Sequence, residues 1–142
     1  MSLRNSPPFR ADHVGSLLRT APLKEARAKH AKGEISADAL KTVEDREIAA
    51  IIRKQEDVGL KAVTDGEFRR AFWNYDFLGR LDGVESYLGE RKFKFEGANP
   101  KPMMLRVVGK LGTFSSHPML DHFRFLKERA GVVPKMTIPS PS

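Results

Sequence analysis

The chain contains no cysteine among its 142 residues. Disulfide bonds, thiolate metal ligands and cysteine nucleophiles are therefore excluded as contributions of this chain. Histidine is scarce as well, and the four histidines, His13, His30, His117 and His122, show no His-x-His or His-x3-His spacing. We therefore predict no zinc site built from these residues alone.

Long hydrophobic runs are also missing. No segment approaches the ~20 consecutive apolar residues that a membrane-spanning helix needs. The N-terminal stretch 1–16 lacks the apolar core of a signal peptide. From these features we predict no membrane partner and a cytoplasmic location.

Basic residues outnumber acidic ones, with 25 Lys and Arg against 18 Asp and Glu and a net charge of +7. Such a balance can indicate nucleic-acid binding. The basic residues are instead spread over 22–33, 91–94, 101–110 and 124–135, mostly beside acidic neighbours, without a zinc-finger or aromatic RNA-binding signature. Solvated helix faces explain most of the excess, so we predict no nucleic-acid partner.

Helix signals dominate the first half of the chain, after a leader, 1–8, that prolines interrupt and that we expect to be disordered. A short helix is predicted over 22–32, because a proline stands at the first position of this segment and a glycine follows its last position. The clearest element is 36–58, where Ser36 is a good N-cap and apolar residues recur at three- and four-residue steps. Gly59 then stands in the position of a left-handed C-cap, which ends the helix.

Apolar segments between the helix signals predict a parallel sheet. A further helix is predicted over 118–130, and four segments have the composition of strands, at 9–18, 60–64, 103–111 and 133–139. The order helix, glycine, strand is that of an αβ unit, and such units build parallel sheets. Four parallel strands form either a small open sheet or the N-terminal half of a (β/α)8 TIM barrel.

One region departs from this alternation. At about 84–102 the sequence KFKFE alternates polar and apolar residues, and a loop rich in Gly, Asn and Pro follows it. We predict a hairpin-like excursion there, inserted after the second strand of an α/β domain that covers 9–142.

Two carboxylates, Asp65 and Glu67, flank Gly66 directly after the second predicted strand. In parallel α/β folds, ligands bind beyond the carboxyl ends of the strands, where loops and helix N-termini converge. A carboxylate at such a tip can accept hydrogen bonds from the ammonium group of a ligand. The alternative is structural: Asp-Gly is a common turn dipeptide, so that Asp65 caps a turn while Glu67 pairs with Arg69 or Arg70 at the surface.

Aromatic side chains gather just after the carboxylates. Five aromatic residues fall within ten positions: Phe68, Phe72, Trp73, Tyr75 and Phe77. Aromatic rings beside a carboxylate can form the wall of a binding cleft, and equally they can pack in the core. Trp73 is the ring that we predict to contact a ligand.

The end of the first predicted strand, DHVGS at 12–16, provides a second polar group. Gly15 and Ser16 can offer backbone N–H groups and a hydroxyl to a ligand carboxylate. His13 can hydrogen-bond a ligand, although a lone histidine more often has a structural role. Since the tips of parallel strands share one rim, we predict that Ser16 and Glu67 converge there on one ligand.

Four motifs, in order, resemble the cobalamin-independent methionine synthase family, and most closely its short bacterial members: FRADHVGSLLRT, KAVTDGEFRRAFW, KPMMLRVVGKLGT and VPKMTIPSPS. The resemblance implies a (β/α)8 barrel that transfers a methyl group from a methyl-folate to the thiol of homocysteine, which a zinc ion activates as the thiolate. It also implies that Gly15 and Ser16 contact the amino-acid end of homocysteine and that Glu67 holds its ammonium group. His13 and Asp65 belong to the pattern of the short members.

The chain departs from the family in its metal ligands. The family's zinc is held by histidine, cysteine and glutamate side chains from the second half of the barrel, whereas this chain has no cysteine. The resemblance therefore implies an N-terminal portion that is inactive alone and that either self-associates or needs a missing C-terminal half.

Two alternatives to this reading stay open. One is a thiol-dependent, epoxide-opening enzyme of the same superfamily that uses coenzyme M, and the other is a non-catalytic half-barrel assembly protein. A sulfonate substrate would need a cation where Glu67 lies, so this glutamate favours an amino acid.

Overall fold

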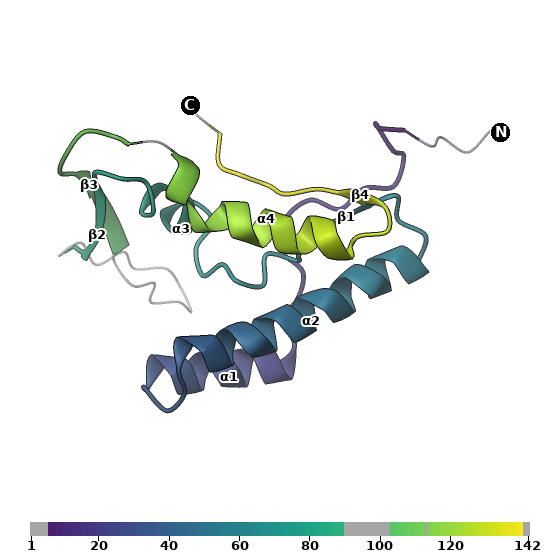
Figure 1. Ribbon diagram of the computed structural model, residues 1–142, viewed down its shortest axis with the longest axis horizontal. Helices are drawn as coiled ribbons and strands as arrows, with labels where there is room; N and C mark the ends of the chain where they lie inside the picture. Colours follow the sequence, from purple (N-terminus) through teal and green to yellow (C-terminus); the bar gives the residue numbers. More distant parts are fainter. Residues whose placement is uncertain (1–5, 90–102, 113, 141–142) are drawn as a thin grey trace, which may run out of the picture. The chain divides into compact units, whose positions relative to one another are not determined.

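The computed structural model describes residues 6–89, 103–112 and 114–140. They divide into two units, one within Met1–Arg69 and His122–Thr137, the other within Arg70–Asp121 and Ile138–Ser142. Figure 1 labels the helices and strands of both units. Of the leader predicted at 1–8, the first five residues lie outside the described residues, and 6–8 form bends.

Two helices of the first unit begin at hydroxyl caps. α1, Ala21–Ala31, follows Thr20, and α2, Ala37–Asp57, follows Ser36. Each hydroxyl accepts an N–H of the first turn, at 3.4 Å and 3.1 Å respectively, and so satisfies a group that the helix leaves open. Gly59 has φ +87°, the left-handed conformation expected after a helix end. The helices predicted over 22–32 and 36–58 are thus confirmed to within one residue.

A parallel pair of short strands lies beside these helices in the first unit. β1, Ala62–Val63, pairs with β4, Val133–Pro134, which follows α4, Pro118–Arg129. The N–H of Lys135 donates to the carbonyl of Val63 at 2.9 Å. Parallel strands that each follow a helix form αβ units, so the predicted α/β class is confirmed.

The core of the first unit joins both helices, β1, the turn after β1 and α4. Its fully buried side chains are Leu23, Ile48, Ile52, Val63, Phe68 and Leu126. Burying a side chain of this size contributes about 1.5–3 kcal/mol. Ile48 and Ile52 lie four residues apart on α2, so the predicted apolar face of this helix is the one that packs.

The first predicted strand, 9–18, is a correction. The structure shows no strand there, and residues 10, 11 and 15 form bends, although exposure alternates from residue 12 to residue 18. A single backbone hydrogen bond, from the N–H of Leu17 to the carbonyl of Gly66 at 3.1 Å, joins this segment to the turn after β1. Strand-like residues alone do not make a strand, because the hydrogen bonds of a sheet need a partner strand alongside.

The second unit contains the short helix α3, Tyr75–Leu78, and an antiparallel pair of strands, β2, Val84–Leu88, and β3, Met103–Val107. The segment 103–111 had been predicted as a parallel strand of the barrel, and this is wrong, because Met103 lies opposite Leu88 in an antiparallel register. An apolar run favours a strand without specifying its direction.

Three consequences follow for the predicted barrel. The part of the excursion at 90–102 lies outside the described residues. Within the described residues there are two two-stranded sheets, so the predicted set of four parallel strands is wrong. That the chain forms part of a (β/α)8 barrel stays a prediction.

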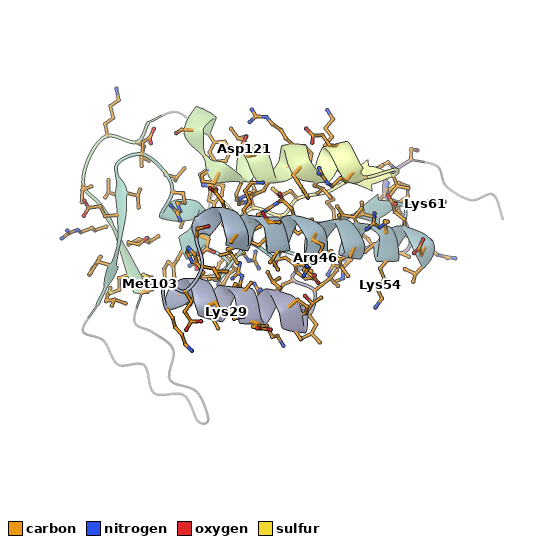
Figure 2. The ribbon with its side chains drawn as sticks, turned by 60° about the horizontal axis from the view of Figure 1, so that its bottom comes forward. Lys29, Arg46, Lys54, Lys61, Met103 and Asp121 are labelled. Atoms are coloured by element: carbon orange, nitrogen blue, oxygen red, sulfur yellow. The ribbon has the colours of Figure 1, made fainter. Side chains whose placement is uncertain are left out.

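Charged side chains cover the outer faces of the helices. Figure 2 labels Lys29 on α1 and Arg46 and Lys54 on α2, all of them exposed. Lys29 forms an ion pair with Glu25 at 2.8 Å, one turn away. Among the described helices, none is long and apolar enough to cross a membrane.

Candidate functional site

A tight turn follows β1 and carries the two carboxylates. The N–H of Phe68 donates to the carbonyl of Asp65 at 3.4 Å, and Gly66 and Glu67 between them have φ values of +67° and +57°. Positive φ at both central positions is typical of a type I′ turn. A Cβ added to Gly66 would lie 2.9 Å from the Phe68 ring, so both the backbone angle and the available space require glycine.

Glu67 stands out in this turn because, within the described ranges, no other residue except glycine has a positive φ. The left-handed conformation costs an L-amino acid about 1–2 kcal/mol. The N–H of Glu67 donates to Oδ1 of Asp65 at 2.9 Å, and the two residues are only 9% and 7% exposed. Backbone strain that the surroundings impose is concentrated at functional sites, which makes Glu67 the leading candidate.

Every carbonyl oxygen from residue 64 to residue 68 accepts a hydrogen bond. Gln55 donates to the Thr64 carbonyl at 2.8 Å, and the N–H of Leu17 donates to the Gly66 carbonyl at 3.1 Å. Arg19 donates to the Glu67 carbonyl at 3.2 Å, and Arg27 donates to the Phe68 carbonyl at 2.7 Å. Four of these five donors lie outside the turn, so the surrounding structure fixes the backbone conformation of the turn.

The segment 12–18 lies against this turn. Because Leu17 bonds to Gly66, the neighbouring residues Ser16 and Glu67 flank one backbone hydrogen bond. Ser16 is exposed and Gly15 is half-buried. The hydroxyl and the carboxylate that the sequence singles out therefore belong to two adjacent segments of one unit.

Lys135, which follows β4, holds the start of the same segment. Its ammonium group binds the carboxylate of Asp12 and the carbonyl of His13. The hydrogen bond from Lys135 outweighs burial and lowers the pKa of Asp12. The imidazole of His13 is engaged as well, since Nε2 donates to the carbonyl of Gly15 at 2.9 Å.

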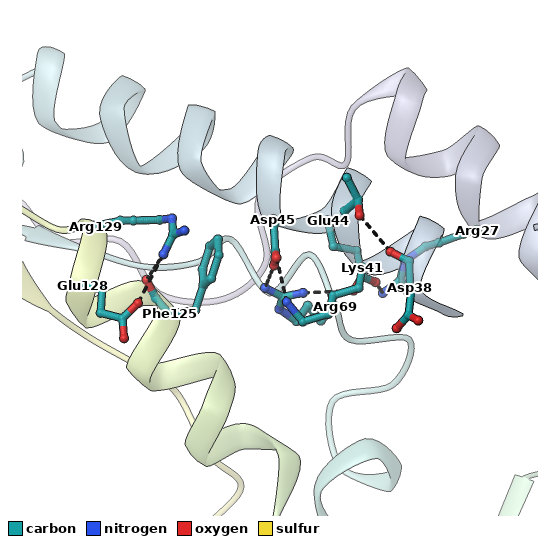
Figure 3. A network of polar contacts seen from close by, with 10 residues as sticks. Arg27, Asp38, Lys41, Glu44, Asp45, Arg69, Phe125, Glu128 and Arg129 are labelled. Carbon is teal, nitrogen blue, oxygen red and sulfur yellow. Dashed lines mark hydrogen bonds and ion pairs between the residues drawn. The ribbon is translucent and has the colours of Figure 1, made fainter. Parts of the chain in front are cut away.

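A network of charged side chains supports the turn from the side of the helices (Figure 3). Arg27 of α1 lies 3.4 Å from a carboxylate oxygen of Glu44, whose other oxygen accepts from Arg69 at 3.1 Å. Arg69 also binds Asp45, and its guanidinium lies 5.0 Å from the ring centroid of Phe125. The side chains of Arg69 and Glu44 are 7% and 11% exposed, so each charge has the several partners that a buried ion needs.

Two carboxylates on α2 have shifted pKa values. Burial raises the pKa of Asp45, but hydrogen bonds from Lys41 and Arg69 together outweigh it and hold the pKa below its ordinary value. A hydrogen bond from the Thr20 hydroxyl is the main cause of a lowered pKa at Glu47. Since Thr20 also caps α1, this bond ties the start of α1 to α2.

The predicted site residues divide between the two units. Five of them lie in the first unit, namely His13, Gly15, Ser16, Asp65 and Glu67, whereas Trp73 lies in the second with 63% of its surface exposed. The structural alternative is correct for Asp65, which caps the turn, and wrong in placing Glu67 at the surface. The ligand-binding roles of these residues stay predictions.

Sequence reasoning missed four residues that hold this region in place. Arg27 and Lys135 fall in the basic segments whose charge the sequence analysis assigns to solvated surfaces, and Arg19 is not singled out there. Nothing in their local sequence distinguishes these three residues from exposed basic ones. Gln55 could have been found, because it continues the buried positions of α2 at a helical spacing from Ile52. A polar residue on an apolar stripe indicates a buried hydrogen bond.

The donor set does not fit a zinc ion. The chain has no cysteine, and no group of three His, Asp or Glu side chains gathers within the described part of the chain. Zinc prefers four nitrogen and sulfur ligands, with carboxylates as occasional substitutes. The described residues therefore offer no zinc site of their own.

Two parallel strands that each follow a helix, β1 and β4, define an α/β protein. The family described as cobalamin-independent synthase, catalytic domain, matches residues 9–93, which is more than half of the chain. The chain belongs to the cobalamin-independent methionine synthase family.

Individual proteins are similar to this chain in sequence. The uncharacterized protein YxjH of Bacillus subtilis is 53% identical over 136 residues, which are 95% of this chain and 36% of YxjH. A 5-methyltetrahydropteroyltriglutamate–homocysteine methyltransferase from a Synechococcus strain is 36% identical over 113 residues, covering 70% of this chain and 15% of the relative.

A solved structure agrees as well. A candidate vitamin-B12 independent methionine synthase from Listeria monocytogenes superposes with a TM-score of 0.77 and 47% identity, over 94% of this chain and 37% of its own. The chain thus spans little more than a third of the length of its similar relatives.

Proposed function

We propose that this chain supplies the amino-acid-binding part of a methyltransferase that moves a methyl group from a methyl-folate to the thiol of homocysteine. The turn at Glu67 is the observation that carries the proposal, because it presents a carboxylate beyond a parallel strand on a strained backbone that surrounding donors fix. The name of the Synechococcus relative, a homocysteine methyltransferase, supports the choice of substrate.

Each residue has a proposed role toward the amino acid. The carboxylate of Glu67 accepts hydrogen bonds from the substrate ammonium group, and the N–H groups and hydroxyl of Gly15 and Ser16 donate to the substrate carboxylate. Charge-assisted hydrogen bonds of this kind contribute about 1.5–3 kcal/mol each. Asp65 holds the turn, and His13 holds the Gly15-Ser16 segment, by the contacts described above.

Preorganisation supports this assignment over a purely structural role. A turn that four outside donors fix does not have to reorganise when a ligand arrives, so less of the interaction energy is lost on binding. A turn that only connected β1 to the following loop would have no need of a strained glutamate, since asparagine or glycine occupies the left-handed region at lower cost.

The rest of the reaction lies with groups outside this chain. We propose that the zinc ligands, the activation of the thiol and the methyl-folate site come from the part of the relatives that the chain does not span. Alone, the chain then binds the amino acid without transferring the methyl group. Its partner is the remaining part of such a protein or a second copy, and Trp73 is a further proposed ligand contact.

Calorimetric titration of the 142-residue chain with L-methionine and L-homocysteine tests the proposal. We expect binding to the unaltered chain, at least a tenfold loss of affinity in Glu67→Gln, and a loss of about fivefold in Ser16→Ala, which removes one hydrogen bond. Glu85→Gln is the matched control, because Glu85 is an exposed carboxylate of the second unit that pairs with Arg106 at 2.9 Å.

Two outcomes contradict the proposal. If neither amino acid binds at millimolar concentration, the proposed function loses its basis. If Glu67→Gln and the unaltered chain bind the amino acid with equal affinity, Glu67 does not belong to the site. Titration with 2-mercaptoethanesulfonate separates the epoxide-opening alternative, since a sulfonate is repelled by the Glu67 carboxylate and we expect no binding.

A further inference from the structure

We infer that Arg19 and Arg27 are positioning residues for Glu67, which hold its backbone in the left-handed conformation by binding the carbonyl oxygens of Glu67 and Phe68. The importance of this for ligand binding rests on the proposed function, whereas the effect on the turn itself does not. The inference thus assigns a role to two basic side chains that touch no proposed ligand.

The closing hydrogen bond of the turn is too long to fix the conformation by itself. The N–H of Phe68 lies 3.4 Å from the carbonyl oxygen of Asp65, whereas amide hydrogen bonds cluster near 2.9–3.0 Å. The Arg27 bond to the Phe68 carbonyl is much shorter, at 2.7 Å, and it is charge-assisted. The left-handed backbone at Glu67 therefore depends on donors from outside the turn.

Arg19 and Arg27 hold consecutive carbonyl groups from different elements. Arg19 lies in the segment after Ser16 and donates to the Glu67 carbonyl at 3.2 Å, while Arg27 lies on α1. The peptide units before and after Glu67 are both held, the first by the N–H of Leu17 at the Gly66 carbonyl (3.1 Å) and the second by Arg19, so the φ and ψ angles of Glu67 are restricted. Arg27 holds the next peptide unit and so restricts the angles of Phe68. Relaxation of Glu67 to a negative φ would turn these carbonyl groups away from their donors.

Arg27 is itself held from α2. The carboxylate of Glu44 lies 3.4 Å from Arg27 and 3.1 Å from Arg69, and Arg69 follows Phe68 directly in the sequence. One nearly buried carboxylate thus joins the arginine that binds the Phe68 carbonyl to the side chain of the next residue. Figure 3 shows Arg27, Glu44 and Arg69 in this network.

Amide hydrogen exchange of the 142-residue chain, followed by NMR without ligand, tests the inference directly. We expect Arg27→Met and Arg19→Met each to raise the exchange rate of the Glu67 amide by about tenfold, since each removes one charge-assisted hydrogen bond. Amides in the middle of α2 should keep their exchange rates. Arg53→Met is the matched control, because Arg53 is an exposed arginine of α2.

Affinity for L-methionine provides the second readout. Both arginine variants should bind it about tenfold more weakly than the Arg53→Met control. Arg27→Lys should recover part of the loss, because a lysine keeps the charge but cannot donate in the planar geometry of a guanidinium. If Arg27→Met does not fold, Arg27→Lys and Arg19→Met decide the question by the same exchange measurement.

An unchanged exchange rate of the Glu67 amide in the variants would overturn the inference, and so would an equal rise at all amides, which indicates global destabilisation. Failure of the unaltered chain to bind either amino acid is a separate result. It would contradict the proposed function, while faster exchange confined to residues 65–68 would still establish Arg19 and Arg27 as positioning residues.

Discussion

The side-chain amide of Gln55 binds both backbone groups of Thr64. Nε2 donates to the Thr64 carbonyl at 2.8 Å, and Oε1 accepts the Thr64 N–H at 3.0 Å. Gln55 and Thr64 are 5% and 4% exposed, so water does not compete for these bonds. A glutamine of α2 thus takes the place of a neighbouring strand at the end of β1, directly before the carboxylate turn.

Replacing this glutamine should destabilise the first unit. Gln55→Leu keeps an apolar side chain of similar size but leaves two buried backbone groups unsatisfied, so we expect a loss of about 2–4 kcal/mol in the free energy of unfolding by urea denaturation. Lys54→Leu, at an exposed position of the same helix, should change it by less than about 0.5 kcal/mol. Equal stability of the two variants would show that the Gln55 bonds contribute nothing.

The positive φ of Glu67 predicts an unusual order of stability between the glycine and alanine variants at this position. Glu67→Gly should be more stable than Glu67→Ala by about 1 kcal/mol, because glycine adopts the left-handed conformation without a steric cost. The same pair of substitutions at Lys54, inside α2, should give the opposite sign, since glycine is about 1 kcal/mol worse than alanine in a helix. Urea denaturation of the four variants measures both differences, and the same sign at the two positions would argue against a left-handed Glu67.

Acid should weaken the charged network around Arg69. The lowered pKa of Asp45 means that its ionised form stabilises the folded chain at pH values above the ordinary value of 3.8, and that this contribution is lost as the pH falls through the folded-state pKa. Asp45→Asn should therefore lower the free energy of unfolding near neutral pH, with a difference from the unaltered chain that shrinks at lower pH. Urea denaturation between pH 2 and pH 7 measures this difference, which a constant offset at every pH would contradict.

His117 in the second unit caps α4 rather than lying at the surface. It is 3% exposed, Nδ1 accepts the N–H of Met119 at 3.1 Å, and Nε2 lies 2.9 Å from the carbonyl oxygen of Phe77. The ring also stacks on Phe114, with 4.6 Å between the ring centroids.

Removal of this cap should destabilise the second unit. We expect His117→Ala to lower its free energy of unfolding by about 2 kcal/mol, from the loss of two hydrogen bonds and a stacked ring. Fluorescence of Trp73 is a suitable probe, because the chain contains one tryptophan and it belongs to this unit. His30→Ala, at an exposed site of α1, is the control, and equal unfolding curves for both variants would contradict the capping role.

Strand direction was the main error of the sequence-based prediction. The segment 103–111 was predicted as a parallel strand because its residues are apolar and precede a helix. Its antiparallel partner, β2, is reached across residues 89–102, and no local feature specifies that pairing. Register and direction are set by which strand lies alongside, and this is a property of the folded chain.

Within the site, the residues were found more easily than their roles. Asp65 and Glu67 could be singled out because two carboxylates directly after an apolar strand are unusual in a core. The arginines that hold the turn could not be, since Arg19 and Arg27 lie 48 and 41 positions away from the carbonyl groups that they bind. Arg27 has the same local sequence environment as the exposed basic residues of α1.

By itself, the sequence determined the helices α1 and α2, their Ser36 and Gly59 boundaries, the buried stripe of α2 and the family of the chain, because capping and periodicity act over a few residues. The tertiary structure alone decided that Glu67 is strained and buried, that Gln55 substitutes for a strand, and which basic side chains are structural. Those properties arise where segments distant in sequence meet, and hydrogen bonds between such segments depend on the whole fold of the unit.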